Sequence, residues 1–327
     1  MANLYTRIAK RIEMTGKDFR SDLKFSPKLA WVRLCANLCG RAGLRFAAAP
    51  AAKKQDAFIR CYLEQTLQPV LARYEADTDP GIASPDSPIW VCWWTGEETA
   101  PPLVRRCIQS IRENAGTHPV RFITRENYGD HLQIPDYMLD KLESGQMGLA
   151  HLADYIRVSL LAEHGGLWLD ATIFCSNTVP ERCFELPFFT CKSPRQSCGY
   201  LSEMRWVTFC LGGWKGNVFF RFLRDAFERY WQVSPCAIDY LFFDYVIELA
   251  YNRLPALREL IDSVPVNNLP RDDLQAAMNE ARPASDFANI LQPDTVLYKL
   301  SWRERYAAQA ANGEDSIFTF FIKGIKE

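Results

Sequence analysis

The chain has 327 residues, of which 48% are hydrophobic and 24% charged, and its net charge is −1. This balance excludes global disorder, which goes with a low hydrophobic content and a large net charge. No stretch without a charged residue is longer than 10 residues, whereas a membrane-spanning helix needs about 20 apolar residues. We therefore expect no transmembrane helix, and either two domains or one large α/β domain with an extension.

Cysteine and histidine usage argues against a metal or disulfide framework. The 11 cysteines are scattered without a Cys-x-x-Cys pair, and the 4 histidines lack metal-ligand spacing. The N-terminus alternates charged and polar residues and does not resemble a secretory signal. We therefore expect free thiols in a reducing, cytoplasmic compartment.

The N-terminal part of the chain is basic. Residues 1–54 carry a local charge of +9, so the remaining residues carry −10. Between Ala30 and Ala52, arginines alternate with the apolar residues Trp31, Val32, Leu34, Leu38, Leu44 and Phe46. This pattern is typical of a segment that lies on an anionic membrane surface, with Arg33, Arg41 and Arg45 meeting head groups. A helix packed on the domain is the alternative; nucleic acid is disfavoured because no binding motif is present and the body is acidic.

A second helix is predicted over about 53–75, where apolar residues recur every three or four positions. This face is expected to pack on the main domain. Residues 77–87 contain Pro80, Gly81 and Pro85 among several Asp and Ser residues and are typical of a linker. We therefore divide the chain into a basic helical extension, 1–86, and a main domain, 87–327.

The main domain begins as an alternation of strands and helices. Strands are predicted at 89–94, 120–124 and 167–169, with helices from Pro101 to Asn114, after Pro135 and over 149–164. Gly165-Gly166 ends the last helix because glycine permits a left-handed backbone. This order predicts an α/β fold with a mostly parallel sheet flanked by helices. Ligands in such sheets bind beyond the carboxyl ends of the strands, where Trp94 and Asp170 fall.

One segment combines the residues that carry chemistry. Asp154 and Arg157 lie three positions apart and share a helix face, and Asp170 follows one helix, one turn and one strand later. The layout can bring one arginine and two carboxylates to a single cleft. By itself, Asp154 could instead be a surface acid paired with Arg157, and Asp170 a residue that caps a turn.

The same segment resembles the sugar-binding region of DXD-containing glycosyltransferases, in particular the bacterial capsular polysaccharide synthesis proteins. These are related to glycosyltransferase family 32 and to the large clostridial glucosylating toxins. The matching elements are Ala-Asp154-Tyr-Ile-Arg157, Gly165-Gly166 and Asp170-Ala-Thr172, in the same order and spacing. Weaker similarities extend over about 87–303, including Asp239–Asp244 and Lys299-Leu-Ser301-Trp302.

The resemblance implies a GT-A fold and transfer of a hexose from a nucleotide-sugar, with a UDP-sugar as the expected donor and retention at the anomeric carbon. The acceptor would be a growing cell-surface polysaccharide or another glycan. Asp154 would accept hydrogen bonds from donor-sugar hydroxyls, and Arg157 would orient Asp154 or touch the sugar or phosphate. Asp170 would serve a metal ion or the ribose and sugar hydroxyls. Together with the basic N-terminal segment, this function leads us to expect a peripheral protein on the inner face of the cytoplasmic membrane.

Further residues receive roles from the same resemblance. Trp94, before Thr95 and Gly96, would stack on uracil or else pack in the core, whereas Trp90, Trp93 and Trp168 are expected in the core. The C-terminal element that closes over the diphosphate would contain Lys299, Ser301 and Trp302. Asp239 would face the donor sugar or acceptor, or else be a solvated acid on a half-buried helix. His151 would touch phosphate or acceptor, or serve as a structural polar contact.

Thr172 is a departure from the family pattern, because the second Asp of Asp-x-Asp is the usual metal ligand. We expect a divalent cation, Mn²⁺ or Mg²⁺, held by Asp170 and Thr172, since hard cations suit carboxylates and diphosphates. A hydroxyl is a weaker ligand, so the ion could also be completed elsewhere or replaced by a cationic side chain such as Lys299.

Other functions remain open on the sequence alone. A glycoside hydrolase also uses two carboxylates but needs no nucleotide site. A non-catalytic, membrane-recruited saccharide-binding protein would agree with Thr172 and the basic arm. A toxin-like transferase that modifies a protein is a third alternative. The sequence identifies neither the donor sugar, the acceptor nor the linkage.

Overall fold

The computed structural model describes residues 15–16, 18–197, 199–281, 291–292 and 294–323. Its centre is a five-stranded sheet of order β2-β1-β3-β6-β5, formed by β1 (Ile89–Cys92), β2 (Val120–Ile123), β3 (Gly166–Leu169), β5 (Phe188–Thr190) and β6 (Cys210–Gly213). β1 is parallel to β2 and β3, while β6 runs antiparallel to β3 and β5. All strands except β6 therefore share one direction, which confirms the predicted mostly parallel α/β sheet. A second sheet pairs β4 (Ile173–Cys175) with β7 (Leu297–Lys299).

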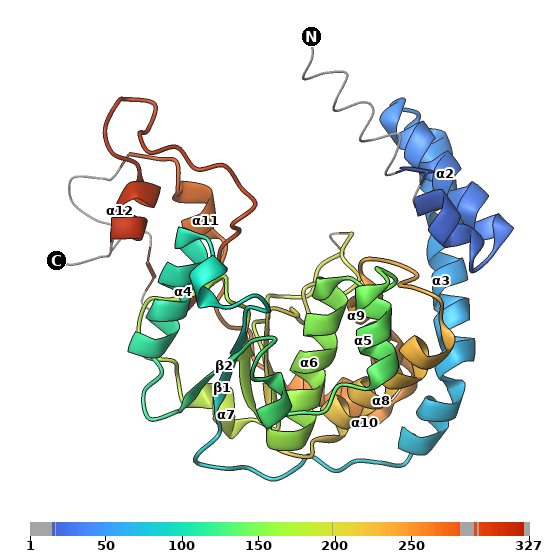
Figure 1. The fold of residues 1–327 in the computed structure, drawn as a ribbon, viewed down its shortest axis with the longest axis horizontal. Helices are drawn as coiled ribbons and strands as arrows, with labels where there is room; N and C mark the ends of the chain where they lie inside the picture. Colours follow the sequence, from blue (N-terminus) through green and yellow to red (C-terminus); the bar gives the residue numbers. More distant parts are fainter. Residues whose placement is uncertain (1–14, 17, 198, 282–290, 293, 324–327) are drawn as a thin grey trace.

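Helices cover both faces of the central sheet (Figure 1). One layer contains α5 (Asp136–Glu143), α6 (Leu149–His164), α8 (Val218–Val233), α9 (Phe242–Arg253) and α10 (Pro255–Ser263). The other contains α4 (Pro102–Glu113), α7 (Arg182–Glu185), α11 (Asp273–Ala277) and α12 (Ile317–Lys323). Successive strand residues point to opposite faces, so Trp90 and Trp168 enter the α6 layer while Leu167 and Leu169 enter the α4 layer. The core placement expected for Trp90 and Trp168 is confirmed, whereas Trp93 is only partly buried against the core of the α4 layer.

The turn from α6 into β3 requires its two glycines. Gly165 has φ +71° and Gly166 has φ +100°, conformations that other residues rarely adopt. A Cβ on Gly165 would lie 2.6 Å from the Lys215 nitrogen, and one on Gly166 would lie 2.2 Å from the Pro88 carbonyl oxygen. The glycine pair therefore ends α6, as predicted, and lets the start of β3 pack closely against the backbone at Pro88 and Lys215.

The N-terminal region forms a helical arm. α2 (Pro27–Arg41) packs against the outer part of α3 (Arg45–Tyr74), and this part of α3 projects from the body together with α2 in Figure 1. The expected helix therefore starts eight residues earlier, at Arg45 rather than Lys53, because the alanine-rich stretch before Lys53 favours helix. The inner part of α3 lies against α8 and α9, as predicted, and buries Ile59, Leu63, Leu67 and Val70. Residues 1–14 and 17 of the predicted basic extension lie outside the described residues.

One arginine of the arm points inward. Arg33 forms ion pairs with Asp22 and with Asp239, the latter at 2.8 Å, and it is not available to a membrane surface. The expected role of Arg33 in meeting head groups is therefore wrong, because these two carboxylates already hold its guanidinium.

The predicted linker, residues 77–87, is irregular but packed on the body. Ile82 pairs with Lys215 in an isolated β-bridge, and Asp77 forms an ion pair with Arg221 at 2.9 Å. The arm thus continues into the main body through a fixed segment. In the part of the chain that the structure describes, no helix is both long and apolar enough to cross a bilayer.

Candidate active site

Three side chains meet at the carboxyl end of β3. Arg157 Nη1 lies 3.0 Å from Asp154 Oδ1, and its Nη2 lies 3.0 Å from Asp170 Oδ1. Asp154 and Arg157 come from one face of α6, while Asp170 follows β3 directly. The structure thus brings together the arginine and the two carboxylates that the sequence places in one cleft. We call these three residues the Asp-Arg-Asp cluster.

Aromatic side chains fix Arg157 in place. Its guanidinium carbon lies 4.9 Å from the Trp168 ring centroid and 5.4 Å from that of Phe243. Trp168 also donates from Nε1 to Asp170 Oδ1 at 3.0 Å. Arg157 is buried, so its charge is compensated mainly by the two carboxylates. The cluster is thus a preorganised arrangement held by the α6 layer of the core.

The two carboxylates have opposite protonation behaviour. Burial raises the pKa of Asp154 to about 7, and the nearby Asp170 and Asp244 charges add to this against the opposing effect of Arg157. For Asp170, burial alone would raise the pKa, but the Arg157 and Lys299 cations and the hydrogen bonds from Trp168 and Lys299 outweigh it, and the pKa is lowered. Near neutral pH, Asp170 is a fixed anion while Asp154 can gain or lose a proton.

Lys299 completes the cluster from the second sheet. In the β4–β7 pairing it lies opposite Ile173, which places its ammonium beside the Asp170-Ala-Thr172 turn. Nζ donates to Thr172 Oγ1 and lies 3.7 Å from Asp170 Oδ2. The expected proximity of Lys299, Asp170 and Thr172 is thus seen, although 127 residues separate Thr172 from Lys299 in the chain.

These contacts test the predicted divalent-cation site. The oxygens that would bind a metal ion are Asp170 Oδ2 and Thr172 Oγ1, and both face the Lys299 ammonium. The other Asp170 oxygen already accepts from Arg157 and Trp168. Among the described residues, no group of three or more His, Cys, Asp or Glu side chains could hold a metal ion. As they stand, the residues do not fit a protein-held Mn²⁺ or Mg²⁺.

Of the two acids in the Asp239–Asp244 segment, Asp244 lies near the Asp-Arg-Asp cluster. Asp244 is on the first turn of α9, accepts from Trp206 Nε1 at 3.0 Å, and raises the pKa of Asp154. Asp239 precedes α9 and forms an ion pair with Arg33 at 2.8 Å. Within the described ranges, Asp239 makes no ion pair or hydrogen bond to the Asp-Arg-Asp cluster. The family resemblance implies a sugar-facing role for Asp239 and does not single out Asp244.

The predicted base-stacking residues lie just beyond β1. The Trp94 ring packs on Tyr128, with centroids 5.4 Å apart and an interplanar angle of 31°. Thr95 is exposed, and Gly96 adopts φ +90° at the start of a short 3-10 turn. Cys92, at the end of the same strand, senses the charges of Arg157 and Asp170, and burial raises the pKa of its thiol to about 12. The Trp94 side of β1 is therefore next to the cluster.

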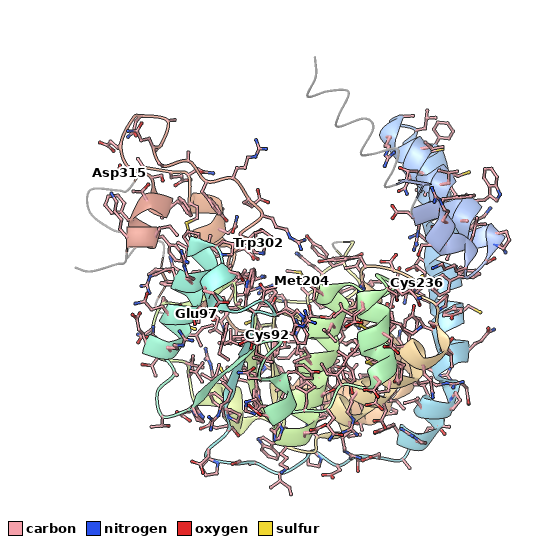
Figure 2. All side chains as sticks on the ribbon, in the orientation of Figure 1. Cys92, Glu97, Met204, Cys236, Trp302 and Asp315 are labelled. Carbon is pink, nitrogen blue, oxygen red and sulfur yellow. The ribbon has the colours of Figure 1, made fainter. Side chains whose placement is uncertain are left out.

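The remaining predicted residues divide between two places. The Trp302 ring is 44% exposed and packs edge-on against Trp93 at 6.0 Å; Figure 2 shows it on the side of the body that carries α11 and α12. Ser301 donates its backbone N–H to Gln275 at 2.7 Å. His151 is buried on α6, lies 3.4 Å from the Asp239 carbonyl oxygen, and burial lowers its pKa. His151 therefore contacts the Asp239 backbone, and no hydrogen bond among the described residues links it to the Asp-Arg-Asp cluster.

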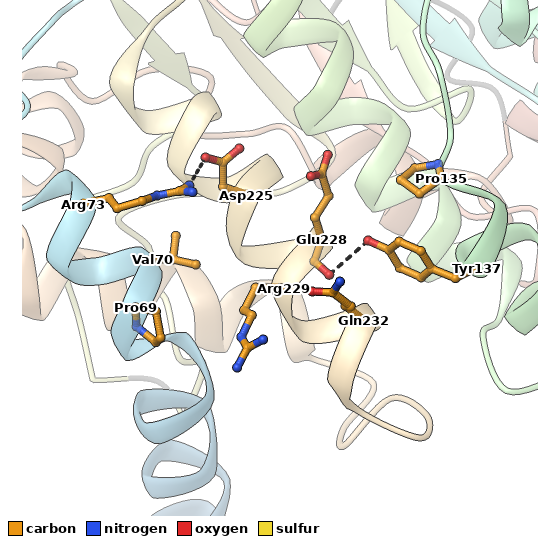
Figure 3. Close-up of a pocket in the computed structure, with 9 residues that line it drawn as sticks. All are labelled: Pro69, Val70, Arg73, Pro135, Tyr137, Asp225, Glu228, Arg229 and Gln232. Atoms are coloured by element: carbon orange, nitrogen blue, oxygen red, sulfur yellow. Dashed lines mark hydrogen bonds and ion pairs between the residues drawn. The ribbon is translucent and has the colours of Figure 1, made fainter.

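A surface hollow of about 560 Å³ lies elsewhere, between α3, α5 and α8 (Figure 3). Its walls include Arg73, paired with Asp225, and Tyr137, which donates to the Glu228 carbonyl oxygen at 3.1 Å. The hollow shares no lining residue with the Asp-Arg-Asp cluster. Arg229 Nε, in this lining, has no hydrogen-bond partner among the described residues. We place the chemistry at the cluster, because the charged residues predicted from the sequence meet there.

A mostly parallel α/β sheet flanked by helices, with a charged cluster at a strand end, is consistent with a GT-A-like fold. Residues 45–321 match the family model of the capsular polysaccharide synthesis proteins, and the chain belongs to that family. The match begins at the start of α3 and is wider than the 87–303 resemblance seen in the sequence.

Two curated fungal proteins are similar to part of the chain. The O-glycosyltransferase braB of Annulohypoxylon truncatum is 28% identical over 163 residues, which cover 45% of this chain and 38% of that protein. The O-glycosyltransferase PaGT of Phomopsis amygdali is 28% identical over 121 residues, covering 31% of this chain and 30% of that protein. The matched regions thus span only about a third of the length of these relatives.

Proposed function

We propose that the protein is a glycosyltransferase that moves a hexose from a nucleotide-sugar to a glycan acceptor, with retention at the anomeric carbon and a UDP-sugar as donor. The observation that carries this proposal is the Asp-Arg-Asp cluster at the carboxyl end of β3, in a chain of the capsular polysaccharide synthesis family. The similarity to two O-glycosyltransferases supports the same class of reaction.

In this reaction an acceptor hydroxyl oxygen forms a bond to the anomeric carbon of the donor. The bond between that carbon and the β-phosphate oxygen breaks, its electron pair stays on the phosphate, and the hydroxyl proton passes to the departing phosphate. Charge therefore develops on the diphosphate, and preorganised cations next to it lower the barrier. Arg157 and Lys299 are the cationic side chains of the site.

The carboxylates suit recognition of the sugar. Asp170 is held as an anion by Arg157 and Lys299, so it accepts hydrogen bonds from sugar or ribose hydroxyls. Asp154, with a pKa near 7, can accept or donate as the ligand demands. Trp94 would stack on the base from the end of β1, where its ring packs on Tyr128.

Nucleotide binding and turnover test this proposal together. UDP at 100 times its Kd should stabilise the fold by roughly 2.7 kcal/mol, whereas GDP, CMP and dTDP should stabilise it less. The rate of UDP release from a panel of UDP-sugars should fall by a factor on the order of 10²–10³ in Asp170→Asn. The matched control is Asp225→Asn, because Asp225 is also an ion-paired acid but belongs to α8. UDP binding without any turnover would favour the non-catalytic saccharide-binding alternative. The absence of both UDP binding and turnover would refute the proposal.

The arm would bring the enzyme to the cytoplasmic face of the membrane. Trp31 is 60% and Phe46 79% exposed, and Leu38 and Leu44 are also exposed. Exposed basic residues on the same two helices are Lys28, Arg41, Lys53 and Lys54. Replacing Trp31 and Phe46 together by Ser should weaken binding to vesicles of anionic lipid, and salt should weaken it further. Equal binding of the wild type and the double variant would instead favour the packed-helix alternative.

A further inference from the structure

Lys299 is held in a defined position by backbone contacts on both sides. Its N–H donates to the Arg271 carbonyl oxygen at 2.8 Å, and the next residue, Leu300, donates to the Thr172 carbonyl oxygen at 3.0 Å. The β4–β7 register then aligns Lys299 with the residue after Thr172. The ammonium therefore reaches the Asp170-Ala-Thr172 turn as a built part of the fold.

The Lys299 ammonium uses the acceptors that a metal ion would need. It donates to Thr172 Oγ1, lies 3.7 Å from Asp170 Oδ2, and is 5.5 Å from the Phe209 ring centroid. A divalent ion bound to the same two oxygens would lie within a few ångströms of this positive charge and would be repelled by it. The Lys299 side chain is nevertheless 28% exposed, so its ammonium can also meet a ligand from the open side.

We propose that Lys299 takes the place of the divalent cation, and that its ammonium neutralises the β-phosphate of the leaving nucleoside diphosphate without a metal ion. This inference rests on the proposed glycosyltransferase function and specifies the chemistry of its leaving-group site. Asp170 then acts as the anchor of Lys299 and Arg157. Thr172 is an acceptor for the ammonium, which a hydroxyl suits without the added negative charge of a second aspartate.

The decisive experiment measures UDP binding by calorimetry and UDP release from the donor panel, each in EDTA and in Mn²⁺. For the wild type, we expect the Kd for UDP and the turnover to change less than twofold between the two conditions. Turnover that is lost in EDTA and restored by Mn²⁺ would overturn the inference while leaving the glycosyltransferase proposal intact. Absence of both UDP binding and UDP-sugar turnover would overturn the proposed function and this inference with it.

Variants of Lys299 give an independent test. Lys299→Ala should lower turnover in EDTA on the order of 10²–10³, and Lys299→Arg should retain most of it because the positive charge remains. Lys141→Ala is the matched control, since the Lys141 ammonium also donates a hydrogen bond within the protein, to the Ser234 carbonyl oxygen at 2.8 Å, but Lys141 belongs to α5. Circular dichroism and the urea midpoint of each variant establish that it folds.

The Lys299→Ala variant should also acquire a response to metal ions. Removal of the ammonium frees Asp170 Oδ2 and Thr172 Oγ1, which are hard oxygen ligands suited to Mn²⁺ or Mg²⁺. We therefore expect Mn²⁺ to restore part of the UDP affinity and turnover of this variant but not to affect the wild type. A purely structural lysine would give a loss that Mn²⁺ leaves unchanged, and that result would overturn the inference.

Discussion

The pKa of Asp154 makes a prediction about stability that needs no substrate. In the folded protein the pKa is raised from the ordinary 3.8 to about 7, so the folded state binds this proton more tightly than the unfolded chain does. The resulting stability is fully present below pH 4 and is lost as the pH rises through 7. Each pKa unit corresponds to about 1.4 kcal/mol, and the full change therefore amounts to about 4 kcal/mol.

Substitution of Asp154 by Asn removes the titrating group while keeping the shape of the protonated acid. The free energy of unfolding of Asp154→Asn minus that of the wild type should therefore rise by about 2–4 kcal/mol between pH 4 and pH 8. We place the expected value below the full change because the side chain is 17% exposed. Urea unfolding at half-unit pH intervals measures the difference and cancels the titration of most other groups.

Asp170→Asn serves as a control of opposite sign. The pKa of Asp170 is lowered on folding, so the charged form stabilises the protein above the unfolded pKa of about 3.9, and that stability is lost as the pH falls through the folded value. The wild type should be more stable than Asp170→Asn at neutral pH, and this difference in the free energy of unfolding should become smaller below about pH 4. A stability difference for Asp154→Asn that does not vary with pH, or that falls as the pH rises, would refute the assignment of a raised pKa to Asp154.

Two further variants test the binding of the base and the turn after α6. Trp94→Ala should weaken UDP binding by about 1–3 kcal/mol, the scale of one base–aromatic contact, whereas Trp31→Ala on the arm should leave calorimetric UDP binding unchanged; equal affinities for both would remove Trp94 from the nucleotide site. Gly165→Ala should lower the free energy of unfolding by more than Gly216→Ala does. Gly165 and Gly216 both have positive φ, but only at Gly165 would an added Cβ meet the backbone, 2.6 Å from the Lys215 nitrogen. A positive φ costs a non-glycine residue about 1–2 kcal/mol, so urea midpoints that shift equally would show that the close contact is relieved elsewhere.

Local signals in the sequence predicted the elements that support the cluster. The apolar periodicity of α6 and the Gly165-Gly166 pair fixed its ends at Leu149 and His164, as the structure has them. Asp154 and Arg157 then share a face through helix geometry alone. Their proximity to Asp170 follows because β3 returns directly after the turn. This part of the site could be predicted because every step depends on neighbouring residues.

Which of Asp239 and Asp244 approaches the cluster depends on a helix boundary that the sequence does not define. Each residue turns a helix by about 100°, so the direction of an acid depends on where the helix begins. α9 begins at Phe242, which puts Asp244 in its first turn and leaves Asp239 in the preceding loop, paired with Arg33. The partner of Asp239 lies 206 residues earlier in the chain, and no periodicity in a single sequence indicates such a contact.

Lys299 illustrates the same limit for strand pairing. The resemblance to capsular polysaccharide synthesis proteins suggested that Lys299 lies near the diphosphate, but β4 and β7 are three residues long and have no strong pattern of their own. Their register alone decides that the ammonium faces Thr172 and Asp170 rather than the opposite side. Only the structure shows that the oxygens expected to bind a metal are already hydrogen-bonded or ion-paired to a cation.

The electrostatics of the cluster connect these observations. Two carboxylates that share one arginine would normally compete for it, and here a second cation resolves the competition: Lys299 and Trp168 support Asp170, whereas Asp154 is hydrogen-bonded, among the described side chains, to Arg157 alone. The pKa values of the two acids are therefore driven apart, the condition under which paired carboxylates take different roles. A permanent anion beside a group that exchanges its proton near pH 7 can bind sugar hydroxyls both as acceptor and as donor. Removing the Lys299 charge should therefore change the protonation of Asp170 as well as the response of the enzyme to metal ions.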